Sequence, residues 1–300
     1  MAGVFSDWPE LDDPSLFFNT GSNSRVEVFG FNLDLPDSLF KRLEKIILTP
    51  KDGDDHKKLD LHLRRESVIS RGILILLISL TSGRSCSDLS FGFESFGKPR
   101  IVTSKEGSSI PSFSLTHSDT YGLAGLSFSR REIGIDLERQ RAIRFLDDVI
   151  RYGFSTEEQK TLFTFPRNER SKQFITVWCR KEAVVKALGE SIARFLSLFS
   201  VPTNKEPEST FEVTDRSSRV HRLYLEDLPL GPGYSGAVCG IGFPPHPRYQ
   251  FLSDRSLRGI FALLEEKELL TKASLDMSSR SLDRTSCRFY RLSYPGAPIF

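Results

Sequence analysis

A short apolar run near the middle of the chain most constrains how this sequence can fold. The run extends from Ile133 to Leu137, is interrupted by Asp136 and is followed by Glu138. On a strand, residues two apart point to the same side, so these two carboxylates would project together. Strands that end in solvated acids are common, so the run alone is only a weak indication of a metal site. It predicts a buried strand with two acids on one face.

A helix predicted from Glu169 to about Leu188 could bring a third acid to that strand. Its apolar residues recur at three- and four-residue spacings, namely Phe174, Val177, Trp178, Val185 and Leu188. Glu182 and Lys186 are one turn apart and share a face, a spacing that most often gives an ordinary helical ion pair. Together with the strand acids, Glu182 could complete a site of oxygen ligands. A lysine beside such a site would suit a phosphorylated substrate bound with magnesium.

The length and charge of the chain limit the classes of protein that fit. The 300 residues suit one large domain or two modest ones. Basic and acidic side chains nearly balance, at 41 against 39, so no overall field favours nucleic acid as a partner. Any basic surface that receives a partner must therefore be local.

The cysteine pattern and the N-terminus indicate a cytoplasmic protein. The cysteines are far apart and form no metal-ligand or redox spacing, which predicts free thiols in a reducing compartment; they are Cys86, Cys179, Cys239 and Cys287. The N-terminus is acidic and has neither a secretory nor a transit pattern. The densest apolar run, Ile73 to Leu80, is too short to span a bilayer. We therefore expect a soluble protein without a membrane partner.

The first part of the chain predicts a mixture of strands and helices. Residues 1–24 predict a flexible lead-in, because they are rich in Pro, Asp, Asn and Ser. The expected elements are a strand over 25–33, a helix beginning at Asp37, a helical stretch over 57–80, a strand over 89–96, and two strands of one hairpin over 121–129 and 132–138. Periodicity does not decide whether the apolar end of the helical stretch is a buried helix or a buried strand.

The second part of the chain repeats the order of helices followed by strands. We expect a short helix over 145–152, a helix opened by a capping box at 155–158, and then the helix that carries Glu182. Strands are expected over 211–213, 220–225 and 234–243, and a C-terminal helix and loose tail over 246–300. The pattern predicts an α+β protein with two halves, at 25–133 and 134–245.

Six motifs, in order, make the sequence similar to one protein family. Gly134 to Glu138, and Trp178 to Lys186 with the Ala187-Leu188-Gly189 that follows, resemble the two signature motifs of the 4′-phosphopantetheinyl transferases of the surfactin-synthetase-activating type. The four shorter matches are Ser70–Gly72, Phe96–Pro99, Leu115–Ser118 and Phe154–Glu158. The resemblance covers about residues 25–245.

This resemblance implies a fold and an activity. The fold would consist of two similar α+β halves with antiparallel sheets, related by pseudo-twofold symmetry, with the active site in the cleft between them. The enzyme would be a monomer that transfers 4′-phosphopantetheine from coenzyme A to a serine of an apo acyl, peptidyl or aryl carrier protein, leaving adenosine 3′,5′-bisphosphate. The metal cofactor would be Mg²⁺, or Mn²⁺ in its place.

The resemblance also assigns roles to individual residues. Asp136, Glu138 and Glu182 would hold the metal ion. Glu182 would also take the proton of the attacking serine hydroxyl, with Glu158 as a second candidate base. Lys186 would hold the phosphate that is attacked. The remaining contacts to coenzyme A would come from Arg71, Lys98, Thr116, His117 and Lys181.

The chain also departs from the family pattern. Thr116 stands where the family usually has serine, and Ile75 where a second basic residue is frequent. Ser191 and Phe195 replace a usual glycine and proline. An inactive member that binds carrier protein or coenzyme A without transfer is therefore an alternative. An unrelated metal-dependent phosphohydrolase is a second alternative, although it does not explain the Gly97-Lys98-Pro99 turn.

A basic loop after the acidic strand is the candidate surface for a carrier protein. Its arginines are Arg139, Arg141, Arg144 and Arg151. They could receive the acidic helix that such carriers usually present, or they could form a solvated loop that balances nearby acids. The sequence does not specify whether the carrier serves fatty-acid, polyketide, nonribosomal-peptide or lysine synthesis.

Overall fold

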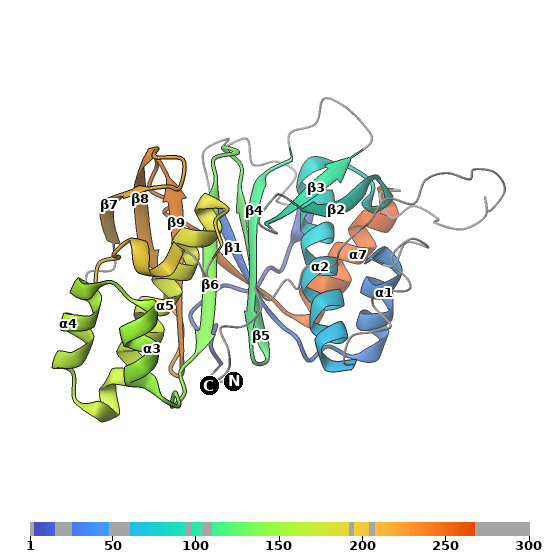
Figure 1. Cartoon of the computed structure of the whole chain (residues 1–300). Helices are drawn as coiled ribbons and strands as arrows, with labels where there is room; N and C mark the ends of the chain where they lie inside the picture. Colours follow the sequence, from blue (N-terminus) through green and yellow to red (C-terminus); the bar gives the residue numbers. More distant parts are fainter. Residues whose placement is uncertain are drawn as a thin grey trace.

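Two four-stranded sheets stand side by side, with helices packed at either flank (Figure 1). The computed structural model describes residues 3–15, 26–47, 61–93, 98–103, 110–191, 195–203 and 208–267. The fold is mixed α+β, and all strand pairs but one within the two sheets are antiparallel. None of the helices in these ranges combines the length and the apolar character needed to cross a membrane.

The first sheet has the strand order β10-β1-β5-β4 and carries three helices. Its strands are β1 (Val26–Asn32), β4 (Ser112–Ser118), β5 (Tyr121–Ser127) and β10 (Arg248–Leu252), and its helices are α1 (Asp37–Ile47), α2 (Leu61–Ser82) and α7 (Asp254–Glu266). The apolar run Ile73–Leu80 lies in α2 and is buried on all sides, because α1 and α7 contact one side of α2 while β4 and β5 contact the other. The ambiguous run is thus a buried helix.

The second sheet has the order β6-β9-β8-β7. Its strands are β6 (Ile133–Arg139), β7 (Glu208–Thr214), β8 (Val220–Asp227) and β9 (Tyr234–Ile241), and its helices are α3 (Leu146–Gly153), α4 (Thr156–Thr164) and α5 (Arg167–Leu188). The smaller elements are the pair β2 (Leu89–Phe93) and β3 (Pro99–Thr103) and the 3-10 turns η3 (Cys86–Asp88) and η4 (Leu196–Leu198). Each sheet has its own apolar core, and a third core lies between the sheets.

Helix α5 packs directly on β6 because Gly134 leaves room for the helix backbone. A Cβ atom at Gly134 would overlap the carbonyl oxygen of Ala183 and the backbone nitrogen of Ala187. Only glycine permits so close an approach of a helix to a strand. The contact places Glu182 and Lys186, which directly precede these two alanines in α5, beside the acids of β6.

The predicted hairpin between residues 121–129 and 132–138 is wrong. β5 pairs with β1 on one edge and with β4 on the other, each over seven residues. No edge of β5 is left for β6, which pairs with β9 in the second sheet. The short connection between β5 and β6 therefore carries the chain from one sheet to the other.

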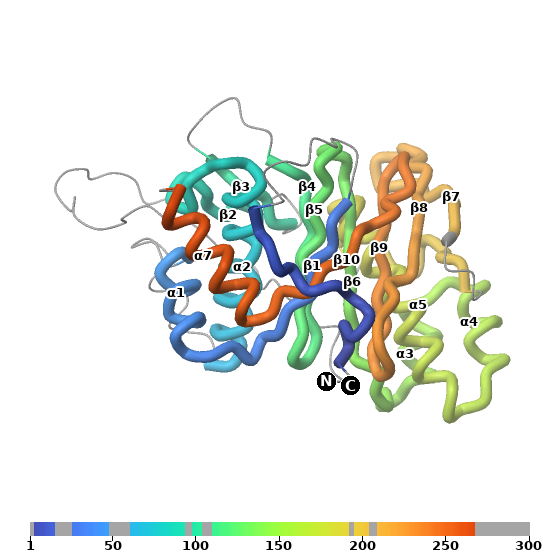
Figure 2. The backbone as a smooth tube through the Cα atoms, turned by 180° about the vertical axis from the view of Figure 1, so that it is seen from behind, coloured from blue at the N-terminus to red at the C-terminus, as the bar shows by residue number. Residues whose placement is uncertain are grey.

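The predicted flexible lead-in is wrong for residues 3–15. Residues 3–11, which we call the N-terminal strap, cross behind both sheets (Figure 2). Its apolar side chains are buried; they are Val4, Phe5, Trp8 and Leu11. The strap bonds to the second half through the Trp8 Nε1–H, which donates to the Pro229 carbonyl at 2.8 Å. It bonds to the first half through the Leu11 N–H, which donates to the Phe251 carbonyl at 3.0 Å.

The segment after residue 246 returns to the first sheet. β10, which the sequence pattern did not predict, pairs with β1 in parallel. The expected C-terminal helix is α7, which buries Leu257, Ile260, Phe261 and Leu264. The predicted loose tail, residues 271–300, lies outside the described residues.

Candidate functional site

Asp136 on β6 is contacted from both halves of the molecule. It is buried, and its Oδ1 accepts hydrogen bonds from Lys186 Nζ at 2.6 Å and from Thr116 Oγ1 at 3.1 Å. Lys186 comes from α5 in the second half, whereas Thr116 comes from β4 in the first. The other oxygen, Asp136 Oδ2, is buried without a hydrogen-bond partner. A buried carboxylate oxygen in this state is costly unless a further positive group or donor approaches it.

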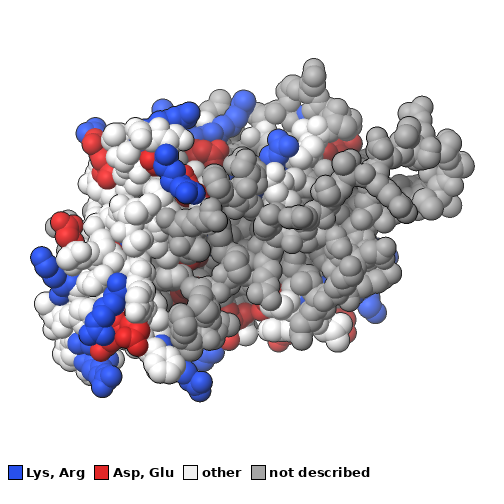
Figure 3. Space-filling model, viewed as in Figure 1, with Lys and Arg blue, Asp and Glu red and all other residues white. Residues whose placement is uncertain are grey.

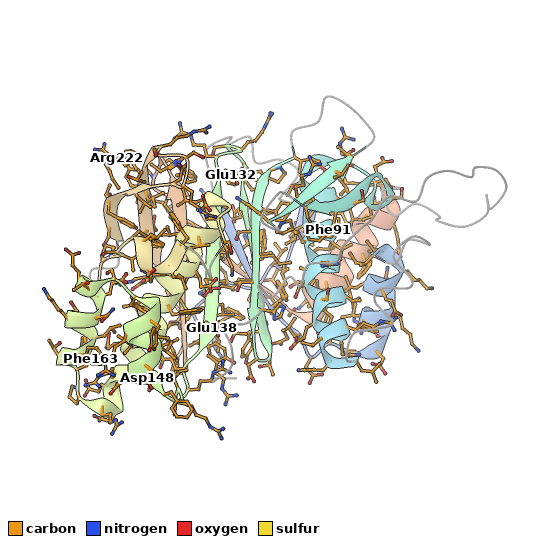
Figure 4. All side chains as sticks on the ribbon, viewed as in Figure 1. Phe91, Glu132, Glu138, Asp148, Phe163 and Arg222 are labelled. Carbon is orange, nitrogen blue, oxygen red and sulfur yellow. The ribbon has the colours of Figure 1, made fainter. Side chains whose placement is uncertain are left out.

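Glu138 lies on the same strand, two residues further on (Figure 4). Its Oε2 accepts a hydrogen bond from Ser118 Oγ at 2.9 Å. Burial, and then the nearby charge of Asp136, raise the pKa of Glu138 to about 7. Asp136 and Glu138 therefore lie two residues apart on one strand, as the sequence predicts.

Glu182 on α5 is the third acid, and it is buried. Burial first, and then the charge of Asp136, raise the pKa of Glu182 well above its ordinary value, while Lys186 opposes the rise. Glu138 raises it further. The three acids and the lysine thus share one electrostatic neighbourhood where the two sheets meet.

The three acids do not form a preformed metal cage. In the described ranges, no group of three or more His, Cys, Asp or Glu side chains is arranged to hold a metal ion. The chemistry of the donors nevertheless fits a hard cation, which takes carboxylate and other oxygen ligands. The unpartnered Asp136 Oδ2 is an oxygen that such a cation could use. The Lys186 ammonium group forms an ion pair with the other oxygen of Asp136, Oδ1.

The residues predicted to grip the remaining phosphates lie around the first half. His117 is half-buried on β4, and burial, followed by the charges of Lys186 and His62, lowers its pKa to about 4. Its imidazole is therefore neutral at pH 7. Arg71 is buried in α2, with its guanidinium 5.5 Å from the centre of the Phe91 ring.

Lys98 lies at the other end of β6 from Glu138. Its Nζ donates to Glu132 and, at 3.3 Å, to the Ala187 carbonyl at the end of α5. The structure therefore brings Lys98 to both halves of the molecule, but within the described part of the chain it bonds to Glu132 and Ala187 rather than to the acids of the site. Figure 4 labels Glu132 and Glu138 at the two ends of the strand.

Lys181 and Glu158, which the sequence predicts as site residues, form a buried ion pair with each other. Lys181 is fully buried, and its Nζ donates to both carboxylate oxygens of Glu158, at 2.8 and 2.7 Å, and to the Phe199 carbonyl at 2.7 Å. Glu158 also accepts the Ser155 and Val201 N–H groups. This ion pair joins α4, α5 and the segment after η4. Neither side chain reaches solvent, which argues against a phosphate contact for Lys181 and against Glu158 as a base. Both roles stay predictions.

The departures from the family pattern near residue 195 fill the second core. Phe195 is buried, and its ring centre lies 5.0 Å from that of Phe199. Ser191 lies just after the end of α5, and the residues between it and Phe195 lie outside the described ranges. The Phe195 substitution therefore contributes apolar packing rather than a group at the carboxylates.

Ser118 is a site residue to which the sequence analysis assigned no role. It contacts Glu138 directly and also accepts the Arg139 N–H at 3.0 Å. A signal was present in the sequence, because hydroxyl residues alternate along β4 at Ser112, Ser114, Thr116 and Ser118. Alternate residues of a strand share a face.

The basic loop after β6 carries exposed aromatic side chains as well as arginines. Phe145 and Tyr152 are 69% and 86% exposed. Two of the arginines form ion pairs with nearby acids, Arg139 with Asp119 at 3.1 Å and Arg151 with Asp148 at 3.5 Å. Positive and negative side chains are interspersed at the end of the molecule formed by α3 and α4 (Figure 3). The loop is thus partly balanced by local acids.

Comparison with known proteins gives a family for the part of the chain that carries the site. Residues 132–239 match the model of the 4′-phosphopantetheinyl transferase superfamily. The chain is 29% identical over 185 residues to the 4′-phosphopantetheinyl transferase HetI of Nostoc sp., which covers 62% of this chain and 77% of that protein. It is 28% identical over 163 residues to the 4′-phosphopantetheinyl transferase Sfp of Bacillus subtilis, covering 54% of this chain and 66% of that protein.

A third relative is also named as a 4′-phosphopantetheinyl transferase. The chain is 34% identical over 122 residues to a putative 4′-phosphopantetheinyl transferase of Synechocystis sp., covering 40% of this chain and 48% of that protein. The matched region holds β6, α5 and the acids they carry. This part of the chain is therefore similar to the 4′-phosphopantetheinyl transferase superfamily, and the relatives that it matches are named as transferases.

Proposed function

We propose that this protein transfers the 4′-phosphopantetheine group of coenzyme A to a serine hydroxyl of an apo carrier protein. The observation that carries the proposal is the grouping of Asp136, Glu138, Glu182 and Lys186 at the meeting of the two sheets. These residues lie within the region matched to the superfamily. That the protein is a cytoplasmic monomer with pseudo-twofold symmetry stays a prediction.

The proposed reaction forms a bond between the serine oxygen and phosphorus and breaks the diphosphate bond, so that adenosine 3′,5′-bisphosphate leaves. Glu182 would take the serine proton, directly or through water. Its place beside Asp136 and Lys186 suits this role, because a general base must lie within reach of the proton that it takes. Lys186 would hold the attacked phosphate and offset its negative charge.

Asp136 and Glu138, together with Glu182, would hold a divalent metal ion. Their oxygen donors and the unpartnered Asp136 Oδ2 support this assignment. Bound Mg²⁺ would offset the charge of the diphosphate. Because the three acids do not form a complete cage on their own, substrate oxygens and water would supply the remaining ligands.

The first half would hold the nucleotide end of coenzyme A. His117 beside Lys186 and the buried guanidinium of Arg71 supply donors on this side of the site. Lys98 would exchange its contact with Glu132 for a phosphate. A lysine ammonium group forms charge-assisted hydrogen bonds with a phosphate as well as with a carboxylate.

The carrier protein would dock on the loop and helix that follow β6. Phe145 and Tyr152 offer exposed apolar area, and Arg141 and Arg144 offer positive charge. Aromatic and arginine side chains are enriched at protein interfaces, and an acidic partner would complement this surface.

The proposal is tested by incubating the protein with coenzyme A, Mg²⁺ and apo carrier proteins and measuring the intact mass of each carrier. We expect one carrier to gain the mass of phosphopantetheine. Asp136→Ala should abolish the gain, whereas Glu212→Ala, which removes an exposed acid on β7, should not. Binding of coenzyme A without any mass gain would support the inactive alternative, and breakdown of coenzyme A without transfer would support the phosphohydrolase.

A further inference from the structure

The two sheets meet along β4 and β6, and side-chain hydroxyl groups make the contact. β4 and β6 are each the last strand of their own sheet, and they lie side by side (Figure 1). Every second residue of β4 carries a hydroxyl group toward β6. We call these residues the hydroxyl ladder; they are Ser112, Ser114, Thr116 and Ser118.

The ladder replaces main-chain pairing between the sheets. Ser114 Oγ accepts the Ile135 N–H at 3.0 Å, and Ser118 Oγ accepts the Arg139 N–H at 3.0 Å. The outward N–H groups of an edge strand otherwise need water or another strand as partner. The hydroxyl oxygens therefore satisfy the backbone of β6 without joining the sheets into one.

Two ladder residues also direct their protons at the acids of the site. Ser118 Oγ already accepts the Arg139 N–H, so its single proton is committed to Glu138 Oε2 at 2.9 Å. Thr116 Oγ1 accepts from Lys186 Nζ at 3.2 Å and donates to Asp136 Oδ1 at 3.1 Å. In both cases one carboxylate oxygen is held from the opposite sheet, and the second oxygen of Asp136, Oδ2, is buried without a hydrogen-bond partner.

We propose that Ser118 is a positioning residue that orients Glu138 for the divalent ion, and that Thr116 does the same for Asp136. The inference rests on the proposed function, which assigns these acids to the ion. Groups that hydrogen-bond a metal ligand orient it and tune its affinity for the metal. The first half of the molecule thereby shapes the metal site without supplying a charged ligand to it.

The test is Mn²⁺ binding to the full chain, measured by electron paramagnetic resonance with coenzyme A present and no carrier protein, so that no turnover is needed. Ser118→Ala should weaken Mn²⁺ binding about tenfold. Ser118→Thr keeps the hydroxyl group and should retain the wild-type affinity. Ser114→Ala is the matched control: it removes a ladder hydroxyl that bonds only to backbone, so it should lower the thermal midpoint but leave the affinity unchanged.

The outcomes separate this inference from the proposed function. If the wild type binds Mn²⁺ and Ser118→Ala binds it equally well, the positioning role is overturned and the metal site stands. Equal loss of Mn²⁺ affinity in Ser118→Ala and Ser114→Ala would also overturn the positioning role. The hydroxyl ladder would then affect Mn²⁺ binding only by stabilising the fold. If the wild type binds coenzyme A but no Mn²⁺, the metal assignment itself fails.

Discussion

Glu138 and Glu182, at the meeting of the two sheets, hold their protons more tightly than isolated carboxyl groups do. Burial is the first cause for both Glu138 and Glu182, and the charge of Asp136 is the second. A positive ion would reverse both effects, because it favours the charged form of each acid. At the scale of single residues, the site is therefore poised to exchange protons for a cation.

Replacing Glu138 by Gln should change how the stability of the metal-free protein depends on pH. The pKa of Glu138 rises from 4.5 to about 7 on folding, so the folded carboxyl group keeps a proton that the unfolded chain loses. The stability from this proton is complete below pH 4.5 and is lost as the pH rises to about 7. The free energy of unfolding of the variant, relative to wild type, should rise over that window by up to about 3 kcal/mol, measured by urea unfolding.

This comparison must use the difference in the free energy of unfolding between the variant and the wild type. The reason is that the titration of His117 changes stability with pH in the opposite direction. Its pKa falls from 6.5 to about 4 on folding, so its contribution is complete above pH 6.5 and is lost as the pH falls toward 4. The contribution of His117 is common to both proteins and cancels in the difference. A constant difference across the window would contradict the raised pKa of Glu138.

Lys181→Met should destabilise the protein without removing its transfer activity. The substitution leaves Glu158 as a buried charge without its ammonium partner, which costs about 3–5 kcal/mol. The fraction of the Lys181→Met variant that is folded should keep its transfer activity, since Lys181 contacts Glu158 and Phe199 rather than the acids of the site. Urea unfolding measures the loss of stability, and the carrier mass assay measures the transfer activity.

A second substitution and an exposed pair serve as controls for Lys181. Glu158→Gln added to Lys181→Met should recover most of the lost stability, because it removes the unpaired charge and keeps an acceptor for the Val201 N–H. Arg151→Met breaks an exposed pair and should change stability by less than about 1 kcal/mol. A folded Lys181→Met protein with no transfer activity would restore the role in phosphate binding that the structure argues against.

At the scale of elements, the close packing of α5 on β6 assembles the site. The two acids of the strand and the Glu182–Lys186 pair of the helix meet only because the helix backbone lies against Gly134. The sequence motif that begins with this glycine therefore encodes a packing distance as well as two acids of the site.

Gly134→Ala should destabilise the protein by about 3 kcal/mol, because the added methyl group overlaps backbone atoms that cannot rotate away. Transfer activity should fall more than stability alone explains, since the shift separates Lys186 from Asp136. Gly153→Ala is the matched control: a Cβ atom there meets nothing within 4 Å, and alanine is the better helix former. Activity assays below the unfolding temperature separate the two effects, and a fully active Gly134→Ala protein would refute this packing argument.

Local spacing predicts the acids of the site but not which strands pair. Asp136 and Glu138 follow the two-residue period of a strand, and Glu182 and Lys186 follow the period of a helix, so both pairs could be predicted. The position of Lys181 could not be predicted from its neighbour, because successive helical residues point about 100° apart. Lys181 therefore faces the core while Glu182 faces β6.

Local spacing in the sequence also does not predict which distant segments pair. The parallel pairing of β10 with β1 joins residues more than two hundred positions apart, and nothing in either segment specifies it. The N-terminal strap was hidden because its apolar anchors are separated by polar and proline residues. Such contacts depend on surfaces that exist only once both sheets have formed.

At the scale of the whole molecule, the third core joins the two halves. It contains Val26 and Val28 of β1, Ile133 and Ile135 of β6, and three side chains of the N-terminal strap, namely Val4, Phe5 and Trp8. The strap lies over this core from behind, on the face seen in Figure 2. The halves are thus held together by apolar contact and by the hydroxyl ladder.

Trp8→Ala should destabilise the whole protein by about 3–5 kcal/mol, the usual cost of truncating a buried aromatic side chain. It also removes the hydrogen bond to the Pro229 carbonyl. Asp7→Ala, at an exposed neighbour in the strap, is the control and should have little effect. Urea unfolding checks both, and equal stability of the two variants would show that the strap does not fasten the halves.

The position of Trp8 has a practical consequence for spectroscopy. The chain has two tryptophans, and the second, Trp178, packs beside Phe174 in the core of the second half, with ring centres 5.9 Å apart. Replacing either one by phenylalanine leaves a single indole emitter in a known environment. Fluorescence from Trp8 would then report the parting of the two halves, while emission from Trp178 would report the melting of one of them.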